Sequence, residues 1–229
     1  MKVLAIGSHP DDIEIFMYGL LSACLDRGDN IHLAIATDGS LGGDFPGKRL
    51  VEIRKMETEK ALKNLGKPIF LGFSDGNLHN QPEAQTELTQ LIENIAPDLI
   101  VTHAPEDYHP DHQALSHYIK NATGFKAPIL YADTLLGVNF IPEFYIDITK
   151  YFILKKEAIL THSSQNPKRF LEATEILNRF RSAQCNSPKN HYAEAYRYEK
   201  RFPFSDIRNL LPPSPAYKPY YKGLTDALI

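Results

Sequence analysis

The stretch KVLAIGSHPDDIE, residues 2–14, joins an apolar run to a cluster of charged and titratable side chains. KVLAIG is apolar almost throughout, which is typical of a strand buried on both faces of a parallel sheet. SHPDDIE then places one histidine and three carboxylates within six positions. Such groups are costly to bury unless a cation, hydrogen bonds or water compensates. The stretch therefore predicts a strand that ends in a chemically unusual loop.

The same alternation of strand and helix continues through the first half of the chain. The expected strands are residues 2–7, 31–36, 68–73 and 98–102, and the expected helices are 13–27, 48–65, 83–95 and about 111–121. Four strand–helix repeats predict an α/β fold with a doubly wound, mostly parallel sheet, right-handed crossovers and helices on both faces. In such sheets the ligand site lies beyond the carboxyl ends of the strands. The polar, Gly-rich and His-rich loops all fall at these ends.

Beyond residue 125 the pattern is less regular. Residues 129–133 and 144–148 are expected as strands, 151–162 and 168–183 as helices, and the alternating YAEAYRYEKRF, residues 192–202, as an edge strand. We expect a single domain over residues 1–211. Residues 212–229, rich in Pro and Tyr, are expected as an extended arm. Its tyrosines can line the binding site, stabilise a homo-oligomer or do neither; they are Tyr217, Tyr220 and Tyr221.

Composition excludes several classes of protein. The 229 residues carry a net charge of −3, so no basic excess favours nucleic acid. The two cysteines, Cys24 and Cys185, form no CxxC pattern, which fits a reducing compartment. No apolar stretch approaches about 18 residues, and the first residues do not resemble a signal peptide. We therefore expect a cytoplasmic protein with no membrane span.

A second His-rich loop, HAPEDYHPDH at residues 103–112, follows the fourth expected strand. His9-Pro10-Asp11 and His109-Pro110-Asp111 are the same triplet, and each is followed by a further ligand-type residue, Asp12 or His112. The two loops can meet across the crevice of a parallel sheet. Two imidazoles and one carboxylate are a ligand set typical of catalytic zinc, and they also suit other first-row divalent ions. The remaining carboxylate and histidine can then transfer protons.

The plainer interpretation treats both triplets as turns that start helices. Proline fixes φ, and Asp11, Asp12 or Asp111 can serve as an N-cap. Caps do not require paired histidines, however, so two such loops at matching positions favour a metal site. The histidines without such neighbours are expected to be ordinary surface or core residues: His32, His79, His117, His162 and His191.

HPDDIE with HPDH about a hundred residues later resembles the PIG-L/LmbE-like family of metal-dependent N-deacetylases, which act in mycothiol, bacillithiol and GPI-anchor synthesis. Further matches cover the chain to about residue 200: IRKMETEKALKNLG at 53–66, LGFSDGNL at 71–78 and DITKYFILKKEAILTHSSQ at 147–165. The chain departs from the family's C-G-G-T in FMYGLL, residues 16–21, which retains only Gly19. The loop TDGSLGGDFPG, residues 37–47, is also less typical.

The resemblance implies a Rossmann-like fold and a zinc ion, with Fe²⁺ or another divalent first-row ion as an alternative. The implied metal ligands are His9, Asp12 and His112. It also implies that Asp11 is the general base on a zinc-bound water and that His109 is the electrophile or general acid, oriented by Asp111. Arg54 and Asp75 match positions that hold the sugar.

The expected activity is hydrolysis of an N-acetyl group from a small N-acetylglucosamine-containing conjugate by the deacetylase domain, residues 1–211. One alternative is a metal-dependent amidase on a non-sugar or antibiotic acyl amide. Another is a metal-binding module without catalysis. The presence of Asp11 and His109 beside the three ligands argues against the last, because a structural metal site needs neither. The carrier of the sugar stays open.

Overall fold

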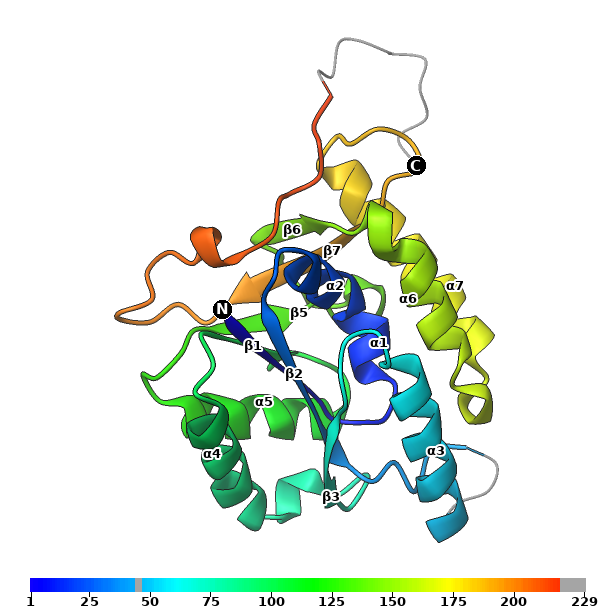
Figure 1. Cartoon of the computed structure of the whole chain (residues 1–229), viewed down its shortest axis with the longest axis vertical. Helices are drawn as coiled ribbons and strands as arrows, with labels where there is room; N and C mark the ends of the chain where they lie inside the picture. The colour runs from blue at the N-terminus through cyan, green and yellow to red at the C-terminus, as the bar shows by residue number, and fades with distance from the viewer. Residues whose placement is uncertain (44–46, 219–229) are drawn as a thin grey trace.

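A computed structural model describes residues 1–43 and 47–218, and these build a seven-stranded sheet with helices on both sides (Figure 1). The strands are β1 (Lys2–Gly7), β2 (Asn30–Thr37), β3 (Ile69–Phe73), β4 (Leu99–His103), β5 (Ile129–Ala132), β6 (Phe144–Asp147) and β7 (Ala193–Tyr198). Their order is β3-β2-β1-β4-β5-β7-β6. The first five strands are parallel, and β7 pairs antiparallel with β5 and β6. The predicted single-domain α/β fold with a mostly parallel sheet is confirmed.

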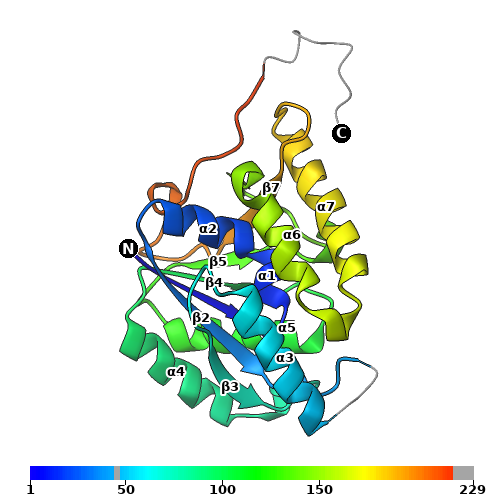
Figure 2. The same ribbon diagram turned by 45° about the vertical axis from the view of Figure 1, so that its right-hand side comes forward.

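Helices cover both faces of the sheet. They are α1 (Asp12–Phe16), α2 (Tyr18–Asp26), α3 (Lys48–Ala61), α4 (Glu83–Ile95), α5 (Pro110–Thr123), α6 (Phe152–Leu160) and α7 (Pro167–Gln184). α4 and α5 pack on one face, and the other five cover the opposite face, where α6 and α7 lie side by side (Figure 2). Among the described residues no helix is long and apolar enough to cross a membrane.

β1 shows why the apolar runs of the sequence are continuous. Val3 and Ala5 belong to the core between the sheet and the larger helical layer, whereas Leu4 and Ile6 belong to the core beneath α4 and α5. All four side chains are fully buried. A strand covered on both faces has no solvent-facing position, so its sequence does not alternate.

Two details of the prediction are wrong. The helix expected over residues 13–27 is broken at Met17, whose backbone (φ −133°, ψ −9°) separates α1 from α2. The strand expected at the sheet edge, β7, lies instead between β5 and β6. Glu194 is buried, because Lys155 forms an ion pair with it inside the protein.

The site is positioned by the order of the strands. β1 pairs with β2 on one side and with β4 on the other, so the chain leaves β1 and β4 at neighbouring points of the same sheet edge. This reversal of strand order is where open α/β sheets bind ligands.

The C-terminal segment packs against the end of β6 and the loop after α7. Its described part is extended: Asp147 N donates to Pro213 O at 3.0 Å, and Ser187 Oγ donates to Ala216 O at 2.8 Å. Tyr217 is exposed. Residues 219–229 of the predicted arm, including Tyr220 and Tyr221, lie outside the described residues.

Candidate active site

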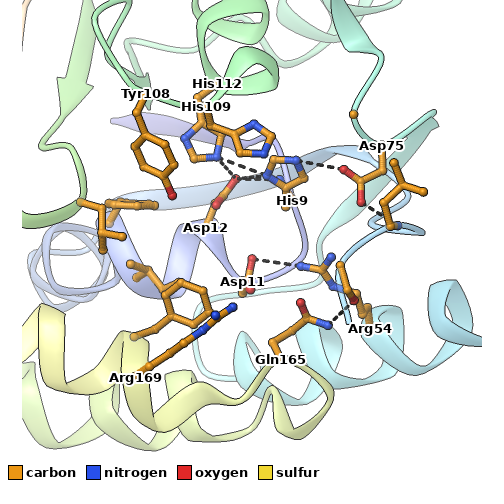
Figure 3. Close-up of a pocket in the computed structure, with 17 residues that line it drawn as sticks. His9, Asp11, Asp12, Arg54, Asp75, Tyr108, His109, His112, Gln165 and Arg169 are labelled. Atoms are coloured by element: carbon orange, nitrogen blue, oxygen red, sulfur yellow. Dashed lines mark hydrogen bonds and ion pairs between the residues drawn. The ribbon is translucent and has the colours of Figure 1, made fainter. Parts of the chain in front are cut away.

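The loops after β1 and β4 bring three side chains together in a triangle of ligand-type atoms (Figure 3). His9 Nδ1 lies 3.2 Å from His112 Nε2 and 3.3 Å from Asp12 Oδ2. Asp12 Oδ2 lies 3.3 Å from His112 Nε2. All three residues are buried. The residues predicted as metal ligands are therefore adjacent, although more than ninety positions separate His112 from the other two in the sequence.

The triangle has the size that a tetrahedral metal ion requires. Zinc bonds of about 2.0–2.2 Å hold the ligand atoms about 3.3–3.6 Å apart. Burial acts to lower the pKa of His112, but the Asp12 and Asp107 carboxylates outweigh it and raise this pKa to about 9. Burial acts to raise the pKa of Asp12, but His112, His103 and His9 hold it well below its usual value. This cluster favours positive charge at its centre, and a divalent ion supplies that charge when the histidines are deprotonated.

Carboxylates hold the outward nitrogen of each imidazole in the triangle. His9 Nε2 lies 3.2 Å from both Asp75 Oδ1 and Asp111 Oδ2. His112 Nδ1 lies 3.1 Å from Asp107 Oδ1. Carboxylate–histidine contacts of this kind fix the ring and its tautomer at metal sites. The sequence analysis did not single out Asp107; its only signal is its place inside the second His-rich loop.

His103 is a second residue that the sequence analysis missed. It ends β4, is buried, and places Nε2 3.0 Å from Asp12 Oδ2. Its ring stacks on that of His112, with 3.7 Å between the centroids and 13° between the planes. His103 thus contacts two corners of the triangle. It stands outside both HPD triplets, so the repeat in the sequence did not mark it.

Asp11 is held in a strained conformation at the start of α1. Its φ of 145° is unfavourable for a residue with a Cβ and costs about 1–3 kcal/mol unless the surroundings impose it. Its side chain makes no capping hydrogen bond, so the interpretation of Asp11 as an ordinary N-cap fails. Oδ1 accepts a hydrogen bond from Arg54 Nη2 at 3.2 Å. Burial raises the pKa of Asp11, and the Arg54 charge opposes this rise.

His109 occupies the N-cap of α5, and its expected partner is different. Its Nδ1 accepts a hydrogen bond from the backbone N–H of Asp111 at 3.1 Å. The Asp111 carboxylate instead contacts His9 and accepts hydrogen bonds from Gly76 N at 2.7 Å and Leu78 N at 3.0 Å. The expectation that the Asp111 side chain orients His109 is therefore wrong, because its oxygens are directed to other groups. Asp111 is not a cap either.

Arg54 and Glu57 show how α3 contributes to the site. Arg54 is 3% exposed and donates to Gly39 O at 3.0 Å and to Pro10 O at 2.9 Å, while its guanidinium lines the pocket. Glu57, one turn later, accepts hydrogen bonds from Ser163 Oγ and from Ser164 N and Oγ. The R-x-x-E spacing therefore places Arg54 at the pocket, while Glu57 binds the loop that follows α6.

A buried pair lies close behind Asp11. His162 Nε2 and Glu14 Oε1 are 2.8 Å apart, and both residues are almost fully buried. Burial acts to lower the pKa of His162, but the Glu14 carboxylate outweighs it and raises the pKa. His162 is a core histidine, which is one of the two locations, surface or core, that the sequence analysis expected for it. Its partner was not predictable, because the two residues are 148 positions apart.

A pocket of about 340 Å³, within the size range of small-molecule sites, is lined by the His9–Asp12–His112 triangle together with Asp11, Arg54 and His109. Asp75 also lines the pocket and accepts a hydrogen bond from Leu41 N at 2.9 Å. In Figure 3, Gln165 and Arg169 enter from the side opposite the His9–Asp12–His112 triangle. The remaining wall is mostly apolar and aromatic: Ile15, Phe16, Leu41, Tyr108, Leu135 and Phe170.

The chain is similar to known deacetylases. The model of the PIG-L family, described as GlcNAc-PI de-N-acetylase, matches residues 4–123. The chain is 28% identical over 220 residues to the diacetylchitobiose deacetylase of Thermococcus kodakarensis, covering 86% of this chain and 82% of the relative. The N,N'-diacetylchitobiose deacetylase of Pyrococcus horikoshii, solved with an inhibitor, has a TM-score of 0.76 at 24% identity and covers 92% of this chain and 88% of that one.

The fold also occurs in a protein with another reaction. The 4-carboxy-2-hydroxymuconate hydratase of Pseudomonas putida has a TM-score of 0.73 at 17% identity, covering 90% of this chain and 99% of that one. The fold by itself therefore does not select the reaction.

Proposed function

This chain belongs to the PIG-L family of GlcNAc-PI de-N-acetylases, and from that premise we propose that it is a metal-dependent N-deacetylase acting on an N-acetylglucosamine-containing conjugate. The observation that carries the proposal is the His9–Asp12–His112 triangle, with Asp11 and His109 lining the same pocket. The Thermococcus relative, described as a diacetylchitobiose deacetylase, supports the sugar substrate. The hydratase with the same fold makes the site, not the fold, the basis of the proposal.

We assign His9, Asp12 and His112 as ligands of zinc, or of Fe²⁺ or another first-row divalent ion. The two nitrogens and one oxygen match the donor set and spacing of a three-ligand catalytic site. Such an ion supplies a Lewis acid and lowers the pKa of water to about 7. Asp75, Asp111 and Asp107 hold the rings of the two histidines, so that the outer nitrogens would carry the protons when the inward nitrogens bind the ion.

Asp11 is the proposed general base. Its carboxylate lines the pocket next to the triangle, and burial raises its pKa toward the range in which a carboxylate takes a proton at neutral pH. Arg54 fixes one of its oxygens, which leaves the other for the attacking water. The strained backbone of Asp11 is consistent with a functional constraint, since folding alone favours a glycine at this φ.

His109 is the proposed electrophile or general acid. Burial and the nearby charges of His9 and His112 lower its pKa. Its Nδ1 accepts the Asp111 N–H, so a neutral His109 carries its proton on Nε2. From that atom it donates a hydrogen bond to the oxyanion that develops from the acetyl carbonyl. To act as general acid on the departing amine, His109 must first be protonated to the imidazolium, which returns to the neutral ring when it gives up that proton.

The sugar would occupy the rest of the pocket. Arg54, Asp75 and Gln165 offer polar contacts to hydroxyl groups, and the aromatic faces of Tyr108 and Phe170 suit the apolar face of a pyranose ring. Binding the sugar between these residues orients the acetamido group toward Asp11 and His109, which is how a pocket lowers the barrier of a bimolecular step.

The test combines metal content with substrate scope. Purified protein, reconstituted with Zn²⁺ or Fe²⁺ under reducing conditions, is assayed for acetate release from N-acetylglucosamine conjugates and from simple acyl amides. We expect about one ion per chain and faster release from the sugars. Faster release from simple amides would favour the amidase alternative. An ion without turnover on either substrate class would favour a binding module, and no ion would reject the proposal.

A further inference from the structure

A buried ion pair lies outside the pocket, between α6 and β7. Lys155 Nζ lies 2.6 Å from Glu194 Oε1, and the two side chains are 0% and 2% exposed. Neither residue lines the pocket. Removing both charges from water is expensive, and such a pair often contributes little net stability. Stability alone therefore does not account for the pair.

Glu194 does more than pair with Lys155. Its Oε1 also accepts a hydrogen bond from Gly19 N at 2.8 Å, and its Oε2 accepts hydrogen bonds from Leu20 N at 2.7 Å and Tyr196 OH at 2.7 Å. Gly19 and Leu20 lie in the first turn of α2, where backbone N–H groups have no partner within the helix. A carboxylate from a distant strand therefore caps α2, and the positive end of the helix favours its charge.

This cap is needed because the chain breaks at Met17. Tyr18 begins a new helix, and its first amides are buried. Gly19 lies so close to Ile148, the residue after β6, that a Cβ there would be 2.4 Å from Ile148 Cγ2. A water molecule or a bulkier residue has no room on that side. Glu194 is thus the acceptor that allows α2 to begin at this point, and Lys155 compensates the charge of Glu194.

The helix before the break carries the site. α1 has five residues, too few to hold a helical conformation without support. Its first residue is Asp12, one corner of the triangle, and its Ile15 and Phe16 line the pocket. The position of α1 is therefore set at one end by the loop after β1 and at the other by the start of α2.

We propose that Glu194 and Lys155 are positioning residues that fix the break between α1 and α2 and, through α1, hold the Asp12 carboxylate in the metal-binding triangle. The proposal rests on the proposed function only for the identity of the metal ligands. A merely structural pair would change stability and leave the metal affinity of the folded protein unaltered.

The test uses a double variant, Lys155→Met with Glu194→Gln, which removes both charges and so avoids an unpaired buried ion. A glutamine has one acceptor oxygen, so it cannot replace both oxygens that cap α2. The matched control is Glu199→Gln. Glu199 also binds one lysine and one tyrosine, Lys120 at 2.6 Å and Tyr131 at 3.1 Å, but no helix amide.

Three quantities are measured on the full chain: the melting temperature without metal, the affinity for Zn²⁺ by competition with a chelator, and kcat and KM. We expect the double variant to bind Zn²⁺ about 10- to 100-fold more weakly, as outer-shell changes do. We expect kcat to fall more than KM changes, and the control to match the wild type. Wild-type Zn²⁺ affinity in the folded double variant would overturn the proposal.

A metal-independent measurement separates this proposal from the proposed function. Amide hydrogen exchange across residues 12–20 is compared between the metal-free wild type and the double variant. We expect faster exchange in the variant, confined to α1 and the start of α2. If the wild type binds no Zn²⁺, the proposed metal site fails, and faster exchange still supports the positioning role. Equal exchange in the two proteins would reject it.

Discussion

The loop after β1 and the loop after β4 contain the same triplet, but their helices begin at different positions of it. In the first loop α1 begins at Asp12, after the triplet, and Asp11 stands at the N-cap position without a capping hydrogen bond. In the second, α5 begins at Pro110, inside the triplet, and His109 is the N-cap. The helix therefore starts two residues earlier relative to the motif in the second loop.

Because of this offset, residues at the same position of the two triplets have different surroundings. At the first position, His9 joins the triangle, whereas His109 caps a helix and faces the pocket. At the third, Asp11 faces Arg54 and the pocket, whereas Asp111 is directed to His9. Only the fourth residues, Asp12 and His112, occupy matching corners of the triangle. A repeated motif thus predicts where a site lies, and the helix start decides what each residue does there.

The largest effect of a substitution is expected at the fourth position, where both loops contribute a proposed metal ligand. Asp12→Ala and His112→Ala each remove one of three proposed ligands, so both should lose the metal and reduce kcat/KM by at least about 10³-fold. Elemental analysis and acetate release measure this. Retention of a full equivalent of metal by either variant would contradict the assignment of the triangle.

The third position should separate the two loops most clearly. Asp11→Asn keeps the hydrogen bond to Arg54 and removes the proposed base, so we expect bound metal and a loss in kcat of about 10²–10⁴-fold. Asp111→Asn weakens the support of His9, so we expect about 10- to 100-fold weaker metal binding. Excess metal should restore only the Asp111 variant. If excess metal also restored the activity of the Asp11 variant, the assignment of Asp11 as base and Asp111 as support of His9 would be wrong.

A smaller difference is expected at the first position. His9→Ala should lose the metal, whereas His109→Ala should keep it and lower kcat by about 10²-fold, the lower range for a proton-transfer residue. His117→Ala is the matched control, because His117 lies on the same helix and forms a hydrogen bond with Asn121 on the exposed surface. Metal loss in the His109 variant would mean that the triangle includes His109.

Local patterns explain what was predictable from the sequence. The continuous apolar runs of β1 and β4 follow from burial on both faces, and they set the parallel sheet and its site edge. The repeated triplet marked both loops. The break at Met17 was not predictable, because its cause is Glu194, 175 residues away from Gly19.

The same reason explains the residues that the sequence analysis missed or misplaced. His103 acts through a ring stack and a contact with Asp12, and Asp107 acts through His112; neither belongs to a repeat. Asp111 was assigned to His109 because the two are neighbours in the motif, but the turn after β3 supplies the Gly76 and Leu78 amides that direct its carboxylate elsewhere. The sequence shows which residues can be ligands, whereas packing between distant parts of the chain decides which groups each residue contacts.

The smallest effect is expected at the second position of the triplets, the prolines. It tests whether the different helix starts in the two loops matter for function. Pro110 stands at the first turn of α5, where its fixed φ suits a helix, so Pro110→Ala should lower the free energy of unfolding by about 0.4–1 kcal/mol and leave kcat unchanged. Pro10 lies outside any helix, packs against Gly39 and precedes the strained Asp11. Pro10→Ala should cost similar stability but lower kcat severalfold, because Asp11 is less constrained. Thermal unfolding and kcat measure both changes. Equal kcat in the two variants would mean that the first loop holds Asp11 without help from Pro10.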